Sequence, residues 1–95
     1  MLVNVGFGNL VNSEKVTAVV NPDAAPIKRL VQNGREAQTV IDATSGRRTK
    51  SVLVMETGQI VLSAMQPDTL ARRFTPAAAA SYAVAGEHSE ITEAD

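Results

Sequence analysis

The hydrophobic residues of this chain fall into short segments whose period changes along the sequence, and this pattern limits the folds open to it. Five segments are short, rich in β-branched residues, or alternate between apolar and polar positions, and are predicted to be strands: residues 2–7, 15–20, 39–43, 50–56 and 59–64. The first two strands are predicted to be joined through residues 8–13. Thr57 and Gly58, between the last two, suit a two-residue hairpin turn.

One stretch between the strands has helical spacing. Asp23 is predicted to cap this helix, and Pro26 falls in its first turn, where a missing N–H does no harm. Apolar residues then recur three and four apart until Gly34, which is predicted to end the helix.

A second helix is predicted to start at Pro67, with Leu70 and Phe74 four residues apart on one face. Strands and helices are thus mixed along the chain, with at least one hairpin among the strands. The pattern predicts an α+β fold with a small mixed sheet of about five strands and two helices.

The composition allows only a thin core. A chain of 95 residues with 44% hydrophobic content is enough for one small domain. It contains no cysteine, so disulfides and thiolate metal sites are excluded, and three aromatic residues leave few large side chains to pack. Small domains without such supports are commonly stabilised by self-association, and we therefore expect a homo-oligomer.

Residues that carry enzyme chemistry are scarce. The single histidine, His88, lies in an acidic segment near the end of the chain, so no catalytic triad or histidine metal site is expected on a rigid element. Gly6 and Gly8 begin like a dinucleotide fingerprint, but Val11 stands where a third glycine is needed. Asp42, the one acid within an apolar strand, is expected to accept hydrogen bonds or pair with an arginine. We predict no enzyme, no cofactor and no small-molecule substrate.

Charge divides the chain into two parts. All nine lysines and arginines lie in residues 1–74, where they meet six acidic residues and give a net charge of +3. Residues 75–95 contain four acidic residues and no lysine or arginine, a net charge of -4. We interpret residues 1–74 as the folded domain and residues 75–95 as a disordered acidic tail. Because no segment has the ~18 apolar residues of a membrane span, we expect a cytoplasmic protein.

A compact basic turn occupies the middle of the chain. Arg47, Arg48 and Lys50 follow Gly46 within a short segment between two predicted strands. Arginine is charged at any working pH, and its planar set of N–H donors matches phosphate oxygens. A pair of arginines on a short, rigid loop therefore predicts phosphate contact, and nucleic acid is the first partner to consider.

The chain also resembles the bacterial extracellular matrix regulatory protein family RemA. Four separated motifs in the same order carry this resemblance: residues 4–9 (NVGFGN), 25–29 (APIKR), 41–52 (IDATSGRRTKSV) and 62–67 (LSAMQP). The similarity extends from about residue 2 to residue 74. It implies a small cytoplasmic protein, related to LytTR-type DNA-binding domains, that activates biofilm matrix genes. It also implies a homo-oligomeric ring, with an octamer as the expected form, that binds arrays of operator sites on double-stranded DNA.

Carried over by position, the family's DNA-contacting arginine pair falls on Arg47 and Arg48, and a further basic contact falls on Lys15. The family's helix proline falls on Pro26. Two positions depart from the family pattern. Lys15 stands where relatives commonly have arginine, which keeps the charge and loses the two-pronged geometry. Ser45 stands where a tyrosine often precedes the glycine, so any packing by that ring is missing.

Two other functions fit the same basic loop. The protein could be an oligomeric scaffold whose arginines contact an acidic partner, or it could bind RNA. The near absence of candidates for exposed aromatic residues argues against base stacking on single strands. A titration of duplex DNA retention against salt separates the first alternative from DNA binding, because a scaffold retains no DNA even at low salt.

The opposite charges of the two parts generate a test. Removal of residues 75–95 is expected to tighten DNA binding several-fold at low salt, because an acidic tail competes with phosphate for the arginines over a screening length of ~10 Å. The gain should fade as salt rises, in filter-binding titrations of the full and truncated chains. Equal affinity at low salt would leave only a solubility role for the tail. A smaller oligomer after truncation would mean that residues 77–84 pack between subunits.

Overall fold

The structure is a computed structural model, and it describes residues 1–74. The predicted tail, residues 75–95, lies outside the described residues. Residues 1–74 form six strands, two α-helices and one 3-10 turn, in the order β1 (Leu2–Asn4), β2 (Leu10–Asn12), η1 (Ser13–Lys15), β3 (Val16–Val20), α1 (Ala25–Glu36), β4 (Val40–Asp42), β5 (Ser51–Met55), β6 (Ile60–Ser63) and α2 (Pro67–Phe74). The α+β fold class with two helices is confirmed, but the described strands form two sheets, of two and four strands, in place of one sheet of about five.

Four of the strands form a mixed sheet in the order β3-β5-β6-β4. β3, β5 and β6 pair antiparallel, whereas β4 pairs with β6 in parallel, with Val40 opposite Ile60 and Asp42 opposite Leu62. The chain passes from β4 to β5, which flank β6 on opposite sides. The connection between these two strands therefore crosses the end of β6, and this crossing positions the basic residues.

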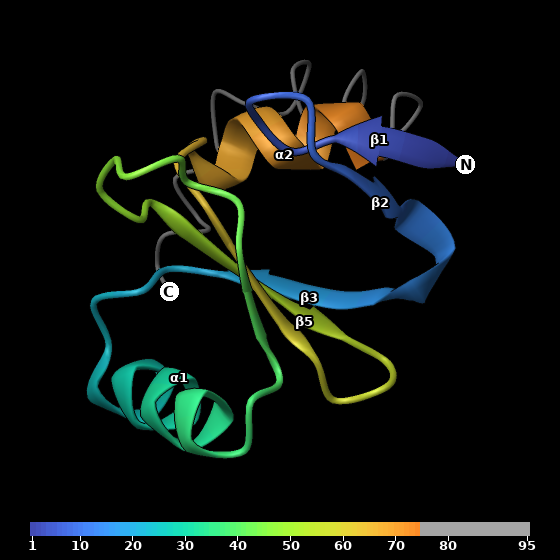
Figure 1. The fold of residues 1–95 in the computed structure, drawn as a ribbon. Helices are drawn as coiled ribbons and strands as arrows, with labels where there is room; N and C mark the ends of the chain where they lie inside the picture. The colour runs from blue at the N-terminus through green and yellow to red at the C-terminus, as the bar shows by residue number, and fades with distance from the viewer. Residues whose placement is uncertain (75–95) are drawn as a thin grey trace, which may run out of the picture.

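Both faces of this sheet are covered, which explains the nearly continuous apolar sequence of β5 and β6. Leu53 and Val61 pack on one face with Val5 and Leu70, from the segments at the two ends of the described chain. Their neighbours in sequence, among them Val52 and Leu62, pack on the opposite face against Ile27 and Val31 of α1. Successive residues of β5 and β6 point to opposite faces of the sheet and so contribute to two thin cores. Figure 1 shows the resulting three layers, with α1 on one side of the sheet and α2 with the β1–β2 hairpin on the other.

The first hairpin corrects the prediction for residues 2–20. Residues 8–13 are not a plain connection, because Leu10–Asn12 form β2 and pair antiparallel with β1. The chain reverses at Gly6, Phe7 and Gly8, which all have positive φ angles (119°, 54° and 79°). Two glycines that tolerate left-handed backbone conformations thus fold β1 back on itself and shorten the predicted strand.

Helix α1 departs from its predicted ends. Its N-cap is Ala24, with no side-chain hydrogen bond, so the predicted cap at Asp23 is wrong. The N–H of Asp23 is itself bound by the side chain of Asn21. Gly34 does not end the helix either, since α1 continues to Glu36 and Gly34 is its buried residue. Pro26 lies in the first turn, as predicted.

The hairpin between β5 and β6 and the second helix are confirmed, but the two-residue turn at Thr57 and Gly58 is wrong. The N–H of Gly58 donates to the carbonyl of Met55 at 2.9 Å, so Glu56 and Thr57 are the central residues of the turn and Gly58 follows them with a φ angle of 93°. α2 begins at Pro67 and ends at Phe74, and its Leu70 is fully buried.

Gly34 provides a test of helix–sheet packing. A Cβ atom at this position would lie 2.8 Å from Cγ2 of Val40 on β4. We expect Gly34→Ala to lower the free energy of unfolding by about 1–2 kcal/mol, because the overlap outweighs the gain of ~1 kcal/mol in helix propensity. Chemical denaturation measures this, with the exposed neighbour changed in Asn33→Ala as the control. A Gly34→Ala protein as stable as the wild type would contradict the close packing.

Candidate functional site

The basic residues of the central motif lie on one connection, which we call the basic loop (residues 43–50). It leaves β4 after Asp42 and enters β5 at Ser51, so it passes over the end of β6. In Figure 1 it is the yellow-green loop that projects from the sheet on the same side as α2.

Both ends of the basic loop are fixed to the strand that it crosses. At its start, the N–H of Ala43 donates to the carbonyl of Leu62 at 2.9 Å, and Ala43 is buried. At its end, the N–H of Lys50 donates to the carbonyl of Ser63 at 2.8 Å, and the hydroxyl of Ser51 donates to the carbonyl of Met65 at 2.5 Å. These bonds hold both ends of the loop in place while its middle projects into solvent.

The middle of the loop is a tight turn. The N–H of Arg47 donates to the carbonyl of Thr44 at 3.0 Å, and the two residues between them, Ser45 and Gly46, have φ angles of 51° and 82°. Two consecutive positive φ angles define a turn that favours glycine, asparagine or aspartate. Gly46 meets this requirement, as its predicted structural role implies, whereas Ser45 adopts a conformation that is strained for most residues.

Asp42 stabilises the first residue of this turn. Its carboxylate accepts hydrogen bonds from the hydroxyl of Thr44 at 2.6 Å and from the N–H of Thr44 at 2.9 Å. The hydroxyl bond is the main cause of a lowered pKa of Asp42, followed by the N–H bond and the positive charge of Arg35, while desolvation opposes them. The prediction that Asp42 is a hydrogen-bond acceptor is confirmed. Its bonds favour the folded loop above the ordinary carboxyl pKa of 3.8 and are lost as the pH falls below that value.

The charged side chains of the loop point outward. Arg47, Arg48 and Lys50 are all exposed. Cζ of Arg47 lies 4.7 Å from the centre of the Phe7 ring, and its Nη1 donates to the carbonyl of Ser45 at 3.3 Å. Within the described part of the chain, Arg48 and Lys50 have no side-chain hydrogen bond or ion pair, so both are available to an external anion.

Arg48 and Lys50 also line a shallow groove of about 200 Å³ between the basic loop and the segment that precedes α1. Asn21, Pro22 and Asp23 form the opposite wall. The carboxylate of Asp23 gives this wall a negative charge, so the groove is less suited to an anion than the projecting face of the loop.

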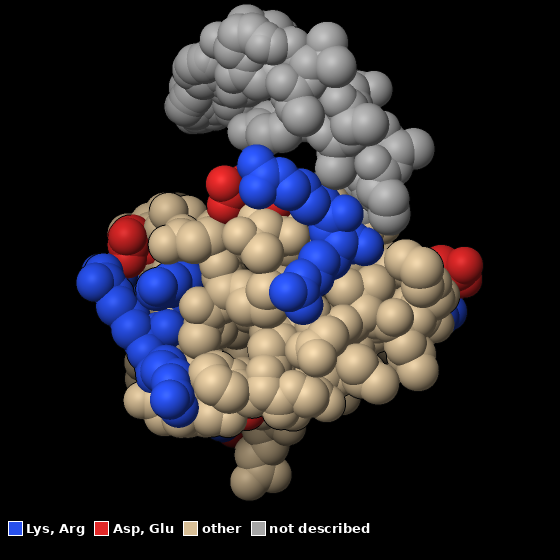
Figure 2. Space-filling view, turned by 90° about the horizontal axis from the view of Figure 1, so that it is seen from above, with Lys and Arg blue, Asp and Glu red and all other residues tan. Residues whose placement is uncertain are grey.

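Phe7 and the two arginines of α2 were missed by the sequence analysis. Figure 2 looks down on α2 and shows basic side chains over this helix as well as at the edge where the basic loop projects. Arg72 and Arg73 lie in the last turn of α2, and Nη1 of Arg73 donates to the carbonyl of Asn4 at 3.0 Å. Phe7 is 52% exposed beside Arg47, so the expectation that exposed aromatic residues are nearly absent is corrected. The position of Phe7 between Gly6 and Gly8 was the sequence signal that could have indicated a turn with an exposed side chain.

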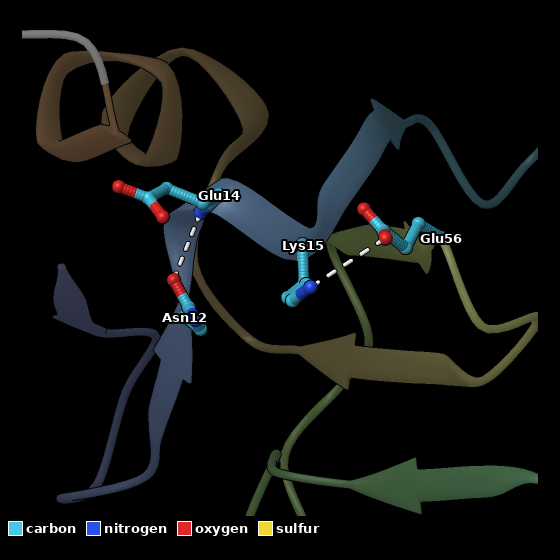
Figure 3. Close-up of polar contacts among 4 residues, drawn as sticks. All are labelled: Asn12, Glu14, Lys15 and Glu56. Carbon is cyan, nitrogen blue, oxygen red and sulfur yellow. Dashed lines mark hydrogen bonds and ion pairs between the residues drawn. The ribbon is translucent and has the colours of Figure 1, made fainter.

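Lys15 lies apart from the basic loop. The carbonyl of Lys15 accepts from the N–H of Glu56, beyond the end of β5, whereas the basic loop precedes the start of β5. Lys50 and Glu56 are six residues apart along this strand, so the two sites are separated by roughly 20 Å at about 3.3 Å per residue. Lys15 is the last residue of η1, whose N-cap is Asn12 (Figure 3). Its Nζ lies 3.6 Å from a carboxylate oxygen of Glu56. Both side chains are 54% exposed, so this ion pair is weak and leaves Lys15 accessible.

A metal-binding cluster is absent from the described residues. Among residues 1–74 there is no group of three or more histidine, cysteine, aspartate or glutamate side chains that could hold a metal ion. No helix in this range is long and apolar enough to cross a membrane. The structure thus defines a small α+β protein whose most distinctive polar feature is a rigid, exposed basic loop.

Comparison with known proteins identifies relatives of this chain. A relative in Lachnoclostridium phytofermentans is 57% identical over 72 residues, which cover 76% of this chain and 79% of the relative. A relative in Symbiobacterium thermophilum is 47% identical over 89 residues, 94% of each chain. One in Acaryochloris marina is 51% identical over 73 residues, 77% of this chain and 83% of the relative. Each is provisionally named a regulatory protein, and none of these names denotes an enzyme.

The chain is therefore of the regulatory class. The profile of the family described as "Extracellular matrix regulatory protein A-like" matches residues 2–74, which is nearly the whole described domain. The protein belongs to this RemA-like family, and the resemblance seen in the four sequence motifs is confirmed.

The Asp42–Thr44 pair gives a test of the loop's anchoring. We expect the Asp42 carboxyl to titrate below 3.8 in the wild type and closer to 3.8 in Thr44→Val, which keeps the shape of the side chain and removes the donating hydroxyl. Nuclear magnetic resonance titration of the carboxyl carbon measures this. Thr49→Val makes the same change elsewhere in the basic loop and should leave the titration unchanged. An unchanged pKa in Thr44→Val would contradict the bond.

Proposed function

We propose that this protein is a DNA-binding transcriptional regulator that contacts the phosphates of duplex DNA through Arg47 and Arg48. The observation that carries this proposal is the rigid basic loop, which presents two arginines and a lysine to solvent on a backbone fixed at both ends. The family description points to genes of the extracellular matrix as targets, and we propose activation of such genes in the cytoplasm.

Rigidity matters because a phosphate contact by a flexible arginine loses side-chain and backbone freedom on binding. In the basic loop, the turn at Ser45 and Gly46 and the bonds to β6 have already restricted the backbone. The guanidinium of Arg48 and the ammonium of Lys50 have no competing partner among the described residues. Arg47 and Arg48 are accordingly proposed as the main contacts, with Lys50 beside them and Gly46 as the residue that shapes the turn.

One copy offers only a few phosphate contacts, so we propose a ring-like homo-oligomer that repeats them. Repetition raises the effective concentration of each further contact, and affinity then arises from the whole assembly. Leu2, Leu10 and Ile41 are each about half or more exposed on strands (65%, 56% and 49%), which supports contact with further copies. Specificity would come from the bendability and spacing of the DNA sites.

Lys15 is proposed as a separate, weaker contact. Since it lies at the far end of β5, one copy would reach phosphates at two distinct places along the DNA or on opposite sides of a groove. Its ammonium group lacks the planar donor geometry of arginine, and Glu56 competes for it. We therefore expect Lys15 to add a purely electrostatic contribution.

Arginine substitutions test the proposal. Arg47→Ala and Arg48→Ala are each expected to weaken binding of duplex DNA by at least about tenfold at ~0.15 M salt, because the lost contact recurs in every subunit. Filter-binding titrations across a salt series measure affinity, and each variant should also show a shallower salt dependence. Arg29→Ala removes the same charge from the exposed side of α1 and serves as the matched control. Circular dichroism should be unchanged in all three.

The alternatives have distinct outcomes in the same experiment. A wild-type protein that retains no duplex DNA at low salt would exclude DNA binding and favour the scaffold function. Tighter retention of single- or double-stranded RNA than of duplex DNA would favour RNA binding. Light scattering completes the test, since the ring predicts a particle well above dimer mass, and a monomer at micromolar concentration would contradict the repeated-contact mechanism.

A further inference from the structure

Phe7 occupies a position that local structure alone does not explain. It lies at the tip of the β1–β2 hairpin with a φ angle of 54°, and its side chain is 52% exposed. Both features are unfavourable for a large aromatic residue, since a positive φ angle is strained and the exposed ring gains little from burial. Residues held in this way are found where the surrounding structure uses them.

The hairpin tip is held firmly by its own hydrogen bonds. The N–H of Val5 donates to the carbonyl of Asn9 at 2.8 Å, and the carbonyl of Gly6 accepts from both the N–H and the side-chain amide of Asn9, at 3.0 and 2.9 Å. The side chain of Asn4 accepts from the N–H of Gly6 at 2.6 Å. The Phe7 ring is therefore carried on a rigid support.

The same buried residue fixes this hairpin and the basic loop. The hydroxyl of Ser63 donates to the carbonyl of Val5 at 2.8 Å, while the carbonyl of Ser63 accepts from the N–H of Lys50 at 2.8 Å. Ser63 is fully buried. Two loops that are forty residues apart in sequence are thus held in fixed relation at the end of β6, and their tips meet at Phe7 and Arg47.

The contact between the two tips places the Arg47 guanidinium over the Phe7 ring. Cζ of Arg47 lies 4.7 Å from the ring centre of Phe7, within the range of a cation–π interaction. Its Nη1 also donates to the carbonyl of Ser45. Stacking occupies the face of a guanidinium and leaves its remaining N–H groups, which lie in the plane, free to donate. Arg48 has no corresponding aromatic neighbour among the described residues.

We propose that Phe7 is a positioning residue for Arg47, and that its ring holds the guanidinium so that the free in-plane N–H groups face a phosphate. This inference rests on the proposed function, because it assigns the orientation of one of its two main contacts. It also explains why a strained, exposed aromatic residue stands at the tip of the first hairpin. The competing role for an exposed phenylalanine on a DNA-binding face is an apolar wedge between base pairs.

The two roles respond differently to substitution. Leucine can act as a wedge but offers no π face, so Phe7→Leu is expected to weaken duplex DNA binding by about three- to tenfold, whereas Phe7→Tyr keeps the ring and should stay within about twofold of the wild type. Leucine, like phenylalanine, is not β-branched, so the strain at φ 54° is similar in both. Leu30→Ala on α1, which the proposal places in no contact, is the control for loss of an exposed apolar side chain.

A double-mutant cycle with Arg47→Ala decides whether Phe7 acts through Arg47. In the Arg47→Ala background, Phe7→Leu should cause no further loss of affinity. An equal loss in both backgrounds would overturn the positioning role and leave Phe7 as a direct DNA contact. Wild-type affinity in Phe7→Leu would overturn it as well, while the proposed function would stand.

Failure of the proposed function can be distinguished from failure of the positioning role of Phe7. A wild-type protein that retains no duplex DNA overturns that function and the role of Phe7 in it. The contact is also measured without DNA, because the ring current of Phe7 should shift the side-chain proton resonances of Arg47 upfield in the wild type and in Phe7→Tyr. These shifts should vanish in Phe7→Leu, and their absence from the wild type would overturn the stacking on which the inference depends.

Discussion

The arrangement of the site depends on the hydrogen bonds of the buried Ser63 hydroxyl. It donates to Val5 of the first hairpin and accepts from the N–H of Met65, while the backbone carbonyl of the same residue receives the end of the basic loop. Three segments that are distant in sequence meet at this one position. A buried polar group left without its partner costs ~1–3 kcal/mol. The three segments are therefore held together by their hydrogen bonds as well as by apolar contact. The apolar contact is modest, since the core on this face consists mainly of valine, leucine and alanine side chains.

Much of the fold could be predicted from the sequence where local pattern and tertiary packing agree. β5 and β6 alternate between two cores, Gly58 supplies the positive φ angle of their hairpin, and Leu70 faces the core from α2. Prediction failed where a distant contact overrides local preference. Gly34 reads locally as a helix stop, but its missing side chain is needed because Val40 of β4 packs against it. β2 was missed because three residues carry too little periodicity to indicate a strand.

The candidate site also has residues that could be predicted from the sequence and residues that could not. Arg47, Arg48, Lys50 and Gly46 could be found from sequence because they are adjacent and between two strands. No local signal pairs Phe7 with Arg47, since the contact depends on how the first hairpin packs on the sheet. Nor could the sequence indicate that Lys15 lies a strand's length from the arginines, because that separation follows from the antiparallel register of β3 with β5. Residue types were predictable, whereas their distances required the topology.

Backbone strain is concentrated around the proposed contact. Among the described residues, three residues other than glycine have positive φ angles: Phe7, Gln38 and Ser45. The Arg47 guanidinium lies over the Phe7 ring and donates a hydrogen bond to the carbonyl of Ser45, so two of the three residues touch the same guanidinium. Each strained residue costs of order 1–3 kcal/mol, which a domain with such thin cores can tolerate only where the surrounding bonds fix it. The strain is therefore best explained by orientation of Arg47. In the proposed ring, loss of freedom at each phosphate contact would be multiplied by the number of subunits, and a guanidinium oriented before binding would reduce that loss in every one.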